Sequence, residues 1–323
     1  MADNDGGWTI VTKKASKSPK AGRKGKKRAQ AGFAYSRRDE EAAAESEEQA
    51  DAAISRIEEL CAALRDSSMH AELQQAVQTH SSSTFDSSKP KETFAEMVLY
   101  GLGCVASSHN AQYQLACALL LKQQCLDCCA PVSMFDPALT SAGTAVAEHF
   151  GCKVLSENES GKRSVNSRTL FFMPHCPMRL YSNLLWANWG EQLRLLTIVG
   201  NSFSSYCDRT VDPAIRKDES NCIFRLEGFA TETLVPLPAA DDHRLPHLQT
   251  AFNDISVLSF SAESLERAVA EGQVAWAVRP PEFSGQDMEL VRSPQDMELV
   301  RSATGDDGAG AGATAACHAA GCC

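Results

Sequence analysis

The dipeptide His175–Cys176 combines an imidazole and a thiol, side chains that proteins use for nucleophilic chemistry and for metal ligation. It stands between Pro174 and Pro177, after the apolar run at residues 169–173 and before an aromatic-rich helical pattern. The pair therefore falls where a predicted strand would pass into a helix. In open parallel sheets, ligand-binding groups gather at this position.

The residue types leave three interpretations of this pair open. A nucleophile and base would need a third, orienting group, and adjacent side chains usually point apart. Alternatively, Cys176 and Pro177 form a Cys-Pro dipeptide of the kind found at thiolate haem-sensing sites, with His175 as a second haem or metal ligand. In a purely structural interpretation, the neighbouring prolines set the turn and the imidazole bonds to backbone.

A glycine turn, Gly101-Leu-Gly103, follows a short apolar run and precedes a helical pattern. This is the context of a turn that holds a phosphate or a nucleotide cofactor. The third glycine of the dinucleotide pattern is replaced by Ala106, which the pattern permits. A tight strand-to-helix turn also requires glycine in the absence of any ligand, so both interpretations stay open.

Two polar residues follow other predicted strands. Asp136 is placed either to bind the ribose hydroxyls of a nucleotide or to cap a helix that begins at Pro137. Asn201 follows the fifth predicted strand and would line the same pocket or shape a turn. Together with Gly101 and Gly103, these residues are the candidate cofactor-binding set.

The elements that must position these residues alternate between strand and helix from residue 93 onwards. This alternation predicts an α/β fold, a Rossmann-like open and mainly parallel sheet flanked by helices. Strands are predicted at residues 97–101, 131–135, 152–155, 170–173, 195–199 and 255–260. The carboxyl ends of parallel strands meet at one sheet edge, so we expect His175, Gly101, Asp136 and Asn201 to face the same edge.

The charge distribution predicts additional segments around this domain. Residues 1–38 hold 11 Lys and Arg against 2 acidic residues, and residues 39–80 hold 11 acidic residues against 2 Arg. Such opposite blocks are typical of tails and solvated helices. The predicted organisation is a basic disordered tail (1–38), an acidic helical segment (39–80), a linker (81–92), an α/β domain (93–283) and a low-complexity tail with a nine-residue duplication (284–323).

The composition also indicates where the protein acts. The first residues contain no apolar core of a secretory signal, and no 18-residue apolar run is present, so we expect no membrane span. Thirteen cysteines without an export signal are typical of a reducing compartment. The basic run at residues 13–28 is either a nuclear-import signal or simply a solvated flexible tail. Its lack of interleaved aromatic residues does not favour direct nucleic-acid binding.

Several sequence blocks together resemble the Sensitivity to Red Light Reduced family over roughly residues 95–260. The block with the greatest specificity runs from the Pro-His-Cys tripeptide to an Asn-Trp pair. Both tails lie outside the resemblance. The blocks are Tyr100-Gly-Leu-Gly103, Tyr113-Gln-Leu-Ala116, Phe135-Asp-Pro137, Met173-Pro-His-Cys176, Tyr181-Ser-Asn-Leu-Leu-Trp-Ala-Asn-Trp189 and Gly200-Asn-Ser-Phe203.

The resemblance implies a cytoplasmic and nuclear regulator. It links such a protein to circadian rhythm and light signalling in plants, and to clock-gene expression and haem biosynthesis in animals and fungi. It carries over no catalytic residue. The expected function is therefore regulation through protein partners or a sensed ligand, haem or a nucleotide. The alternatives are a methyltransferase-like enzyme that binds a nucleotide cofactor, and a scaffold that docks partners through a helix at residues 39–66.

Overall fold

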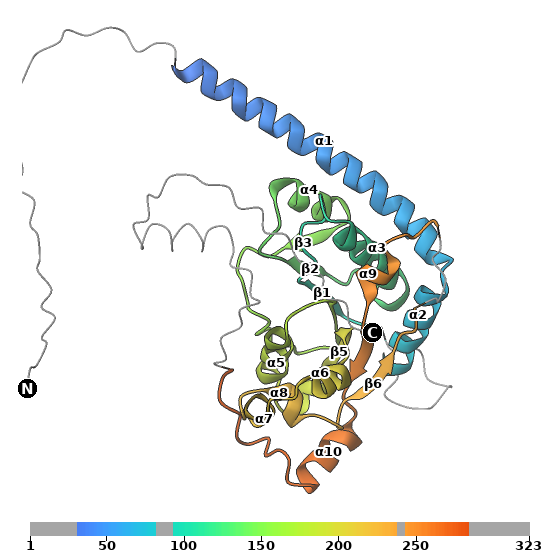
Figure 1. Ribbon diagram of the computed structural model, residues 1–323, viewed down its shortest axis with the longest axis vertical. Coiled ribbons are helices and arrows are strands. Elements are labelled where there is room, and N and C mark those ends of the chain that lie inside the picture. The colour runs from blue at the N-terminus through green and yellow to red at the C-terminus, as the bar shows by residue number, and fades with distance from the viewer. Residues whose placement is uncertain (1–30, 82–92, 238–242, 284–323) are drawn as a thin grey trace, which may run out of the picture. The chain divides into compact units, whose positions relative to one another are not determined.

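The computed structural model describes residues 31–81, 93–237 and 243–283 of the 323-residue chain, with side chains from residue 45 onwards (Figure 1). The predicted basic tail up to residue 30, the linker at 82–92 and the low-complexity tail from residue 284 lie outside the described residues. The chain divides into two units, Met1–Ala43 and Ala44–Cys323. The first contributes the beginning of helix α1 (Ala31–Arg65), and the following paragraphs concern the second.

One seven-stranded sheet with the order β3-β2-β1-β4-β5-β7-β6 organises this unit. Strands β1 to β5 pair with one another in parallel, whereas β7 runs antiparallel to both β5 and β6. The predicted Rossmann-like, mainly parallel α/β fold is thus confirmed. The strands are β1 (Glu96–Tyr100), β2 (Val132–Phe135), β3 (Cys152–Val154), β4 (Thr169–Met173), β5 (Leu196–Asn201), β6 (Thr231–Leu234) and β7 (Ile255–Ser259).

Helices cover both faces of the sheet because its central strands are apolar on both sides. Met97 and Leu99 of β1 belong to one core with α1, α2, α3, α4 and α9, whereas Val98 and Tyr100 belong to a second core with α5, α6, α8 and α10. The remaining helices are α2 (Ser68–Ser81), α3 (His109–Cys125), α4 (Ser141–His149), α5 (Met178–Ala187), α6 (Phe203–Arg209), α7 (Pro213–Arg216), α8 (Cys222–Arg225), α9 (Leu248–Phe252) and α10 (Ala262–Ala270), with a 3-10 helix at Glu191–Leu195.

The predicted start of the second helix at Asp136 and Pro137 is wrong. Helix α4 begins at Ser141, and the Thr140 hydroxyl caps it by accepting a hydrogen bond from the Gly143 amide at 3.1 Å. One oxygen of Asp136 instead accepts from the Ala138 amide at 2.7 Å, which forms a local Asx-type turn ahead of the helix. This turn frees the second carboxylate oxygen for a contact outside its own segment.

Helix α2 is tied to the far end of the sheet by a half-buried histidine. The His80 Nδ1 lies 2.8 Å from the Ser259 hydroxyl on β7, and its Nε2 lies 2.9 Å from the Thr233 hydroxyl on β6. His70, on the same helix, is 2 % exposed. Burial lowers the pKa of both imidazoles below the ordinary histidine value of 6.5.

We therefore expect the free energy of unfolding to fall as the pH drops below about 6.5. Both histidines are neutral in the folded protein, whereas the unfolded chain takes up protons there, so the stability is present above this pH and is lost towards the lowered pKa values. Urea unfolding from pH 8 to pH 5 measures this. The double variant His70→Gln/His80→Gln should flatten the pH dependence, and the exposed control His149→Gln should leave its slope unchanged. Equal slopes in all three proteins would contradict this assignment.

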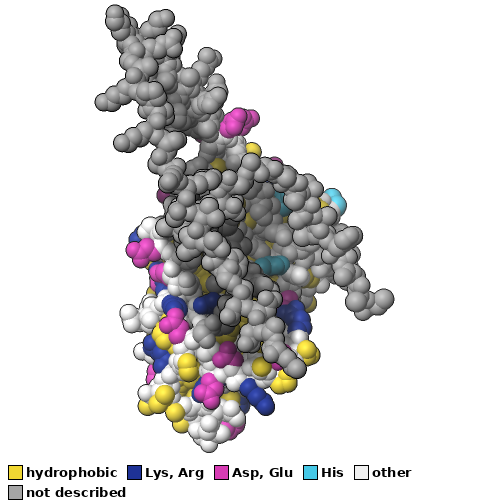
Figure 2. All heavy atoms as spheres, turned by 60° about the vertical axis from the view of Figure 1, so that its left-hand side comes forward, with side chains coloured by type: hydrophobic (Ala, Val, Ile, Leu, Met, Phe, Trp, Pro, Cys, Tyr) yellow, Lys and Arg dark blue, Asp and Glu magenta, His cyan; other side chains and the backbone are white. Residues whose placement is uncertain are grey.

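On the face shown in Figure 2, Lys and Arg side chains of the described residues are interspersed with Asp and Glu side chains. Nucleic-acid-binding domains typically carry a continuous basic stripe instead. The visible described surface therefore resembles an ordinary solvated face.

Candidate functional site

The structure places the candidate residues at the carboxyl edge of the parallel strands. Gly101 follows β1, Asp136 follows β2, and His175 follows β4, while Asn201 is the last residue of β5. The strand order reverses between β1 and β4, and open α/β sheets bind their ligands outside such a switch point. This edge is therefore the candidate site of the molecule.

The glycine turn is closed by the protein's own carboxylate. Gly101 and Gly103 have positive φ angles of 70° and 86°, which residues other than glycine rarely adopt. The Gly103 amide donates a hydrogen bond to Asp136 Oδ2 at 2.7 Å, so this acid joins the turns after β1 and β2. A cofactor phosphate at the Gly103 amide would have to displace the carboxylate.

Cys176 lies beneath this turn. Its thiol is directed towards β1, where it donates a hydrogen bond to the Tyr100 carbonyl at 3.3 Å, and the residue is 1 % exposed. A Cβ atom built on Gly101 would lie 2.5 Å from the Cys176 Sγ, so only glycine leaves room for the sulfur. Burial raises the pKa of this thiol far above its ordinary value, which keeps it protonated.

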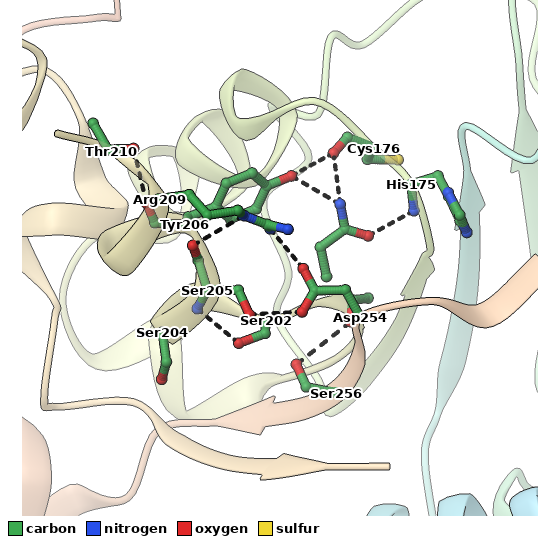
Figure 3. Close-up of polar contacts among 12 residues, drawn as sticks. His175, Cys176, Ser202, Ser204, Ser205, Tyr206, Arg209, Thr210, Asp254 and Ser256 are labelled. Atoms are coloured by element: carbon green, nitrogen blue, oxygen red, sulfur yellow. Dashed lines mark hydrogen bonds and ion pairs between the residues drawn. The ribbon is translucent and has the colours of Figure 1, made fainter. Parts of the chain in front are cut away.

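His175 faces another part of the molecule (Figure 3). Its backbone has a φ of 59°, and its amide donates to Asn201 Oδ1 at 2.7 Å. The ring Nε2 lies 3.0 Å from the Ala251 carbonyl of α9. Because a carbonyl only accepts, this contact places a proton on Nε2, and in the neutral ring it leaves Nδ1 as the acceptor.

These directions bear on haem or metal ligation by His175 and Cys176. The thiol contacts β1 and the imidazole contacts α9, so the two do not present ligands to one ion in this conformation. Among the residues that the structure describes, no group of three or more His, Cys, Asp or Glu side chains is arranged to hold a metal ion. A haem thiolate does not fit the buried Cys176, and ligation there stays a prediction that requires the side chain to leave its pocket.

The Asn201 side-chain amide and the phenols of Tyr206 and Tyr181 hold the turn after β4 in place. The Asn201 Nδ2 donates to the Tyr206 hydroxyl at 2.9 Å, and this hydroxyl donates to the Cys176 carbonyl at 2.8 Å. The backbone amide of Asn201 donates to the Tyr181 hydroxyl at 2.9 Å, and this hydroxyl in turn donates to the Met173 carbonyl. The turn is thereby fixed to both β5 and α6, and Asn201 positions it.

Sequence reasoning missed a second group next to this network. Asp254, which precedes β7 with a φ of 59°, accepts a hydrogen bond from the Ser205 hydroxyl at 2.7 Å and pairs with Arg209 at 2.6 Å. The Asp254 carbonyl also accepts from the Ser202 amide at 3.1 Å. These bonds clamp α6 to β7 across about 50 residues of sequence, a separation at which no local pattern marks the partners.

The His175 imidazole is thus exposed on a hydrogen-bonded turn at the switch point, beside a protonated, buried thiol. The Cys176 sulfur cannot act as a nucleophile without leaving its pocket. The Nδ1 of this exposed residue, when the ring is neutral, can accept a hydrogen bond from a ligand or from a partner protein. The arrangement is better suited to recognition than to covalent catalysis.

A family model described as the SRR1 domain matches residues 69–259. "Protein SENSITIVITY TO RED LIGHT REDUCED 1" of Arabidopsis thaliana is 42 % identical over 116 residues, which cover 36 % of this chain and 42 % of that protein. An "SRR1-like protein" of Mus musculus is 44 % identical over 114 residues, 35 % of this chain and 46 % of the mouse protein. An "SRR1-like protein" of Drosophila melanogaster is 30 % identical over 178 residues, 55 % of this chain and 58 % of its own length.

The chain spans about half the length of these relatives. A solved Nostoc punctiforme structure, described as a candidate O-methyltransferase, is similar over 52 % of each chain at 10 % identity and a TM-score of 0.28. No helix among the described residues is long and apolar enough to span a membrane. The SRR1 domain match begins in α2 and ends at the last residue of β7, so it takes in the whole sheet and its carboxyl edge: the chain belongs to the SRR1 domain family.

Proposed function

We propose that this chain is a regulatory protein that acts through protein partners or a sensed ligand. Membership of the SRR1 domain family carries the proposal, since a relative is named for reduced sensitivity to red light. By the same resemblance, the regulated processes are light- or clock-linked gene expression and haem biosynthesis. The places of action are the cytoplasm and the nucleus.

The candidate site supports recognition at the carboxyl edge. His175 is exposed, its backbone conformation is set by Asn201, and its Nδ1 is left to accept a hydrogen bond. Such a preorganised group loses little conformational entropy on binding, which favours affinity. His175 is the residue through which we expect this edge to contact its ligand or partner.

Rescue of depleted cells tests this function. In cells that express the chain, depletion should change the period of a clock reporter and the messenger RNA level of the first haem-synthesis enzyme, and the wild type should restore both. His175→Asn should fail to restore them at an unchanged melting temperature, because asparagine tolerates the positive φ but lacks the imidazole. His149→Asn, at an exposed site, is the matched control. Full rescue by His175→Asn would contradict a role for this edge.

A second candidate is a methyltransferase-like enzyme with a nucleotide cofactor. One observation favours it: β7 is antiparallel and inserted between β5 and β6, an order shared with Rossmann-like methyltransferases. This is a fold-level analogy, and such folds host many functions. Gly101, Gly103 and Asp136 would be the cofactor-binding residues.

This candidate predicts stabilisation by adenosyl compounds or pyridine nucleotides. At 100 times the dissociation constant, one bound ligand should add about 2.7 kcal/mol to the free energy of unfolding. Thermal-shift assays with S-adenosylmethionine, S-adenosylhomocysteine and the pyridine nucleotides measure this, and Asp136→Asn should reduce the shift. A flat response to all of these compounds would argue against the enzyme and leave the regulatory proposal standing.

A further inference from the structure

A proline-containing segment beyond the SRR1 domain match lies across helix α5. After α10 the chain runs back past α5 (Figure 1), and residues 276–283, Trp-Ala-Val-Arg-Pro-Pro-Glu-Phe, form what we call the strap. Residues 279–283 contain neither helix nor strand. The strap begins well after residue 259, where the domain match ends.

Side chains from α5 and the loop before β4 hold the strap. The Trp186 indole N–H donates to the Pro280 carbonyl at 2.9 Å, and an Arg179 guanidinium nitrogen donates to the Phe283 carbonyl at 3.4 Å. Lys162 forms an ion pair with the Glu282 carboxylate. Each contact joins a donor on the domain to an acceptor on the strap.

Aromatic contacts add to these polar ones. The Arg279 guanidinium lies 4.7 Å from the centroid of the Trp186 ring, so that this indole is stacked on one side while its N–H binds a carbonyl. Trp276 meets Trp189 edge-on at 5.1 Å between ring centroids. Arginine over tryptophan is a favourable cation–π pair.

The strap turns three residues inward and exposes the other five. Pro280 is buried, and Trp276 and Phe283 are half-buried, whereas Val278 is 69 % exposed. Within the described part of the chain, no backbone–backbone hydrogen bond joins residues 279–283 to any other segment. The strap is therefore held by side-chain contacts, as a bound peptide can be, and not as a strand of the sheet.

We propose that the α5 surface, formed by Lys162, Arg179, Trp186 and Trp189, is a binding site for proline-rich peptides and that the strap is its ligand in cis. The partner is a protein segment that offers the same Arg-Pro-Pro-acidic-aromatic chemistry. Such segments are stiff and expose their carbonyls, which suits an indole donor. The inference rests on the proposed function in that it names the class of partner through which regulation would act.

A tethered ligand competes strongly with a partner in solution. An effective concentration on the order of millimolar is typical for a short flexible connection. A peptide that binds the uncovered α5 surface with a dissociation constant of tens of micromolar would then bind the strapped protein roughly 10- to 100-fold more weakly. Partner binding would thus require either a high local concentration or release of the strap.

Binding of a fluorescent peptide with the sequence of residues 276–283 to the full chain tests the proposal. The double variant Arg279→Ala/Glu282→Ala removes the cation–π pair and the ion pair from two exposed strap residues. Fluorescence anisotropy should show at least 10-fold tighter peptide binding to this variant than to the wild type. Adding Trp186→Phe, which keeps a ring but removes the N–H donor, should weaken binding again by about 10-fold.

A charge reversal distinguishes a specific peptide-binding site from nonspecific binding. The strap variant that also carries Lys162→Glu should bind the native peptide poorly. It should bind a peptide with lysine in place of Glu282 more tightly than it binds the native peptide. If a folded strap variant, with an unchanged circular dichroism spectrum, does not bind the peptide, the strap is a fixed part of the fold and the proposal is overturned. This outcome is independent of the cellular rescue, so failure of one is distinguishable from failure of the other.

Discussion

Replacement of Gly101 by alanine should lower the free energy of unfolding by about 3 kcal/mol. A left-handed backbone costs a residue with a Cβ about 1 to 2 kcal/mol, and overpacking a core costs about 1 to 3 kcal/mol. Gly101 has a φ of 70°, and its added Cβ would lie 2.5 Å from the Cys176 sulfur. Urea denaturation at pH 7 measures the loss.

Two variants divide this effect between backbone strain and steric overlap. Gly103 also has a positive φ, of 86°, but the nearest atom to its added Cβ is 4.0 Å away, so Gly103→Ala should show the strain alone, about 1 to 2 kcal/mol. In a Cys176→Ala background the sulfur is absent, and Gly101→Ala should lower the free energy of unfolding by at least about 1 kcal/mol less than it does in the wild type. Additive effects of the Gly101 and Cys176 changes would show that the thiol does not occupy the space beneath the turn.

Replacement of Asn201 by alanine should lower the free energy of unfolding by about 2 to 3 kcal/mol. The change leaves the His175 amide without its acceptor and the Tyr206 hydroxyl without a donor, and each unsatisfied group costs about 1 to 3 kcal/mol where water cannot replace the bond. The same change should release the His175 turn, visible as a shift of the imidazole resonances in NMR spectra. Denaturant unfolding measures the change in the free energy of unfolding.

Milder variants of the same network provide controls. Tyr206→Phe removes one hydroxyl and should cost about 1 kcal/mol. Asn201→Asp keeps the acceptor for the His175 amide and should leave the imidazole resonances closer to those of the wild type than Asn201→Ala does. If Asn201→Ala were no more destabilising than Tyr206→Phe and moved no imidazole resonance, Asn201 would not be the residue that positions the turn.

The sheet could be predicted because its signals are local. Six strands lie within two residues of their predicted ends, since buried parallel strands are short continuous apolar runs between turn residues. Strand β6 and helices α6 to α9 were not predicted. Each of these has four to seven residues, too few for a helical or strand period to stand out, and they depend on tertiary packing for their stability.

The candidate site could be predicted in position but not in contacts. The residues at the ends of β1, β2, β4 and β5 could be located because a strand end is visible in the sequence as an apolar run that stops. Tyr206 and Asp254, which complete the polar networks, carry no comparable signal. Their partners lie on other elements, up to about 50 residues away in the chain.

By itself, the sequence determined the α/β class, the edge of the sheet at which the polar residues gather, and the family. These depend on residue type and local spacing. Only the tertiary structure decided that the Cys176 thiol is buried beneath Gly101, that the Asp136 carboxylate closes the glycine turn, and that the His175 imidazole turns away towards α9. Side-chain direction and burial arise from contacts between segments far apart in the chain, and these contacts set which of the candidate groups a ligand or partner can reach.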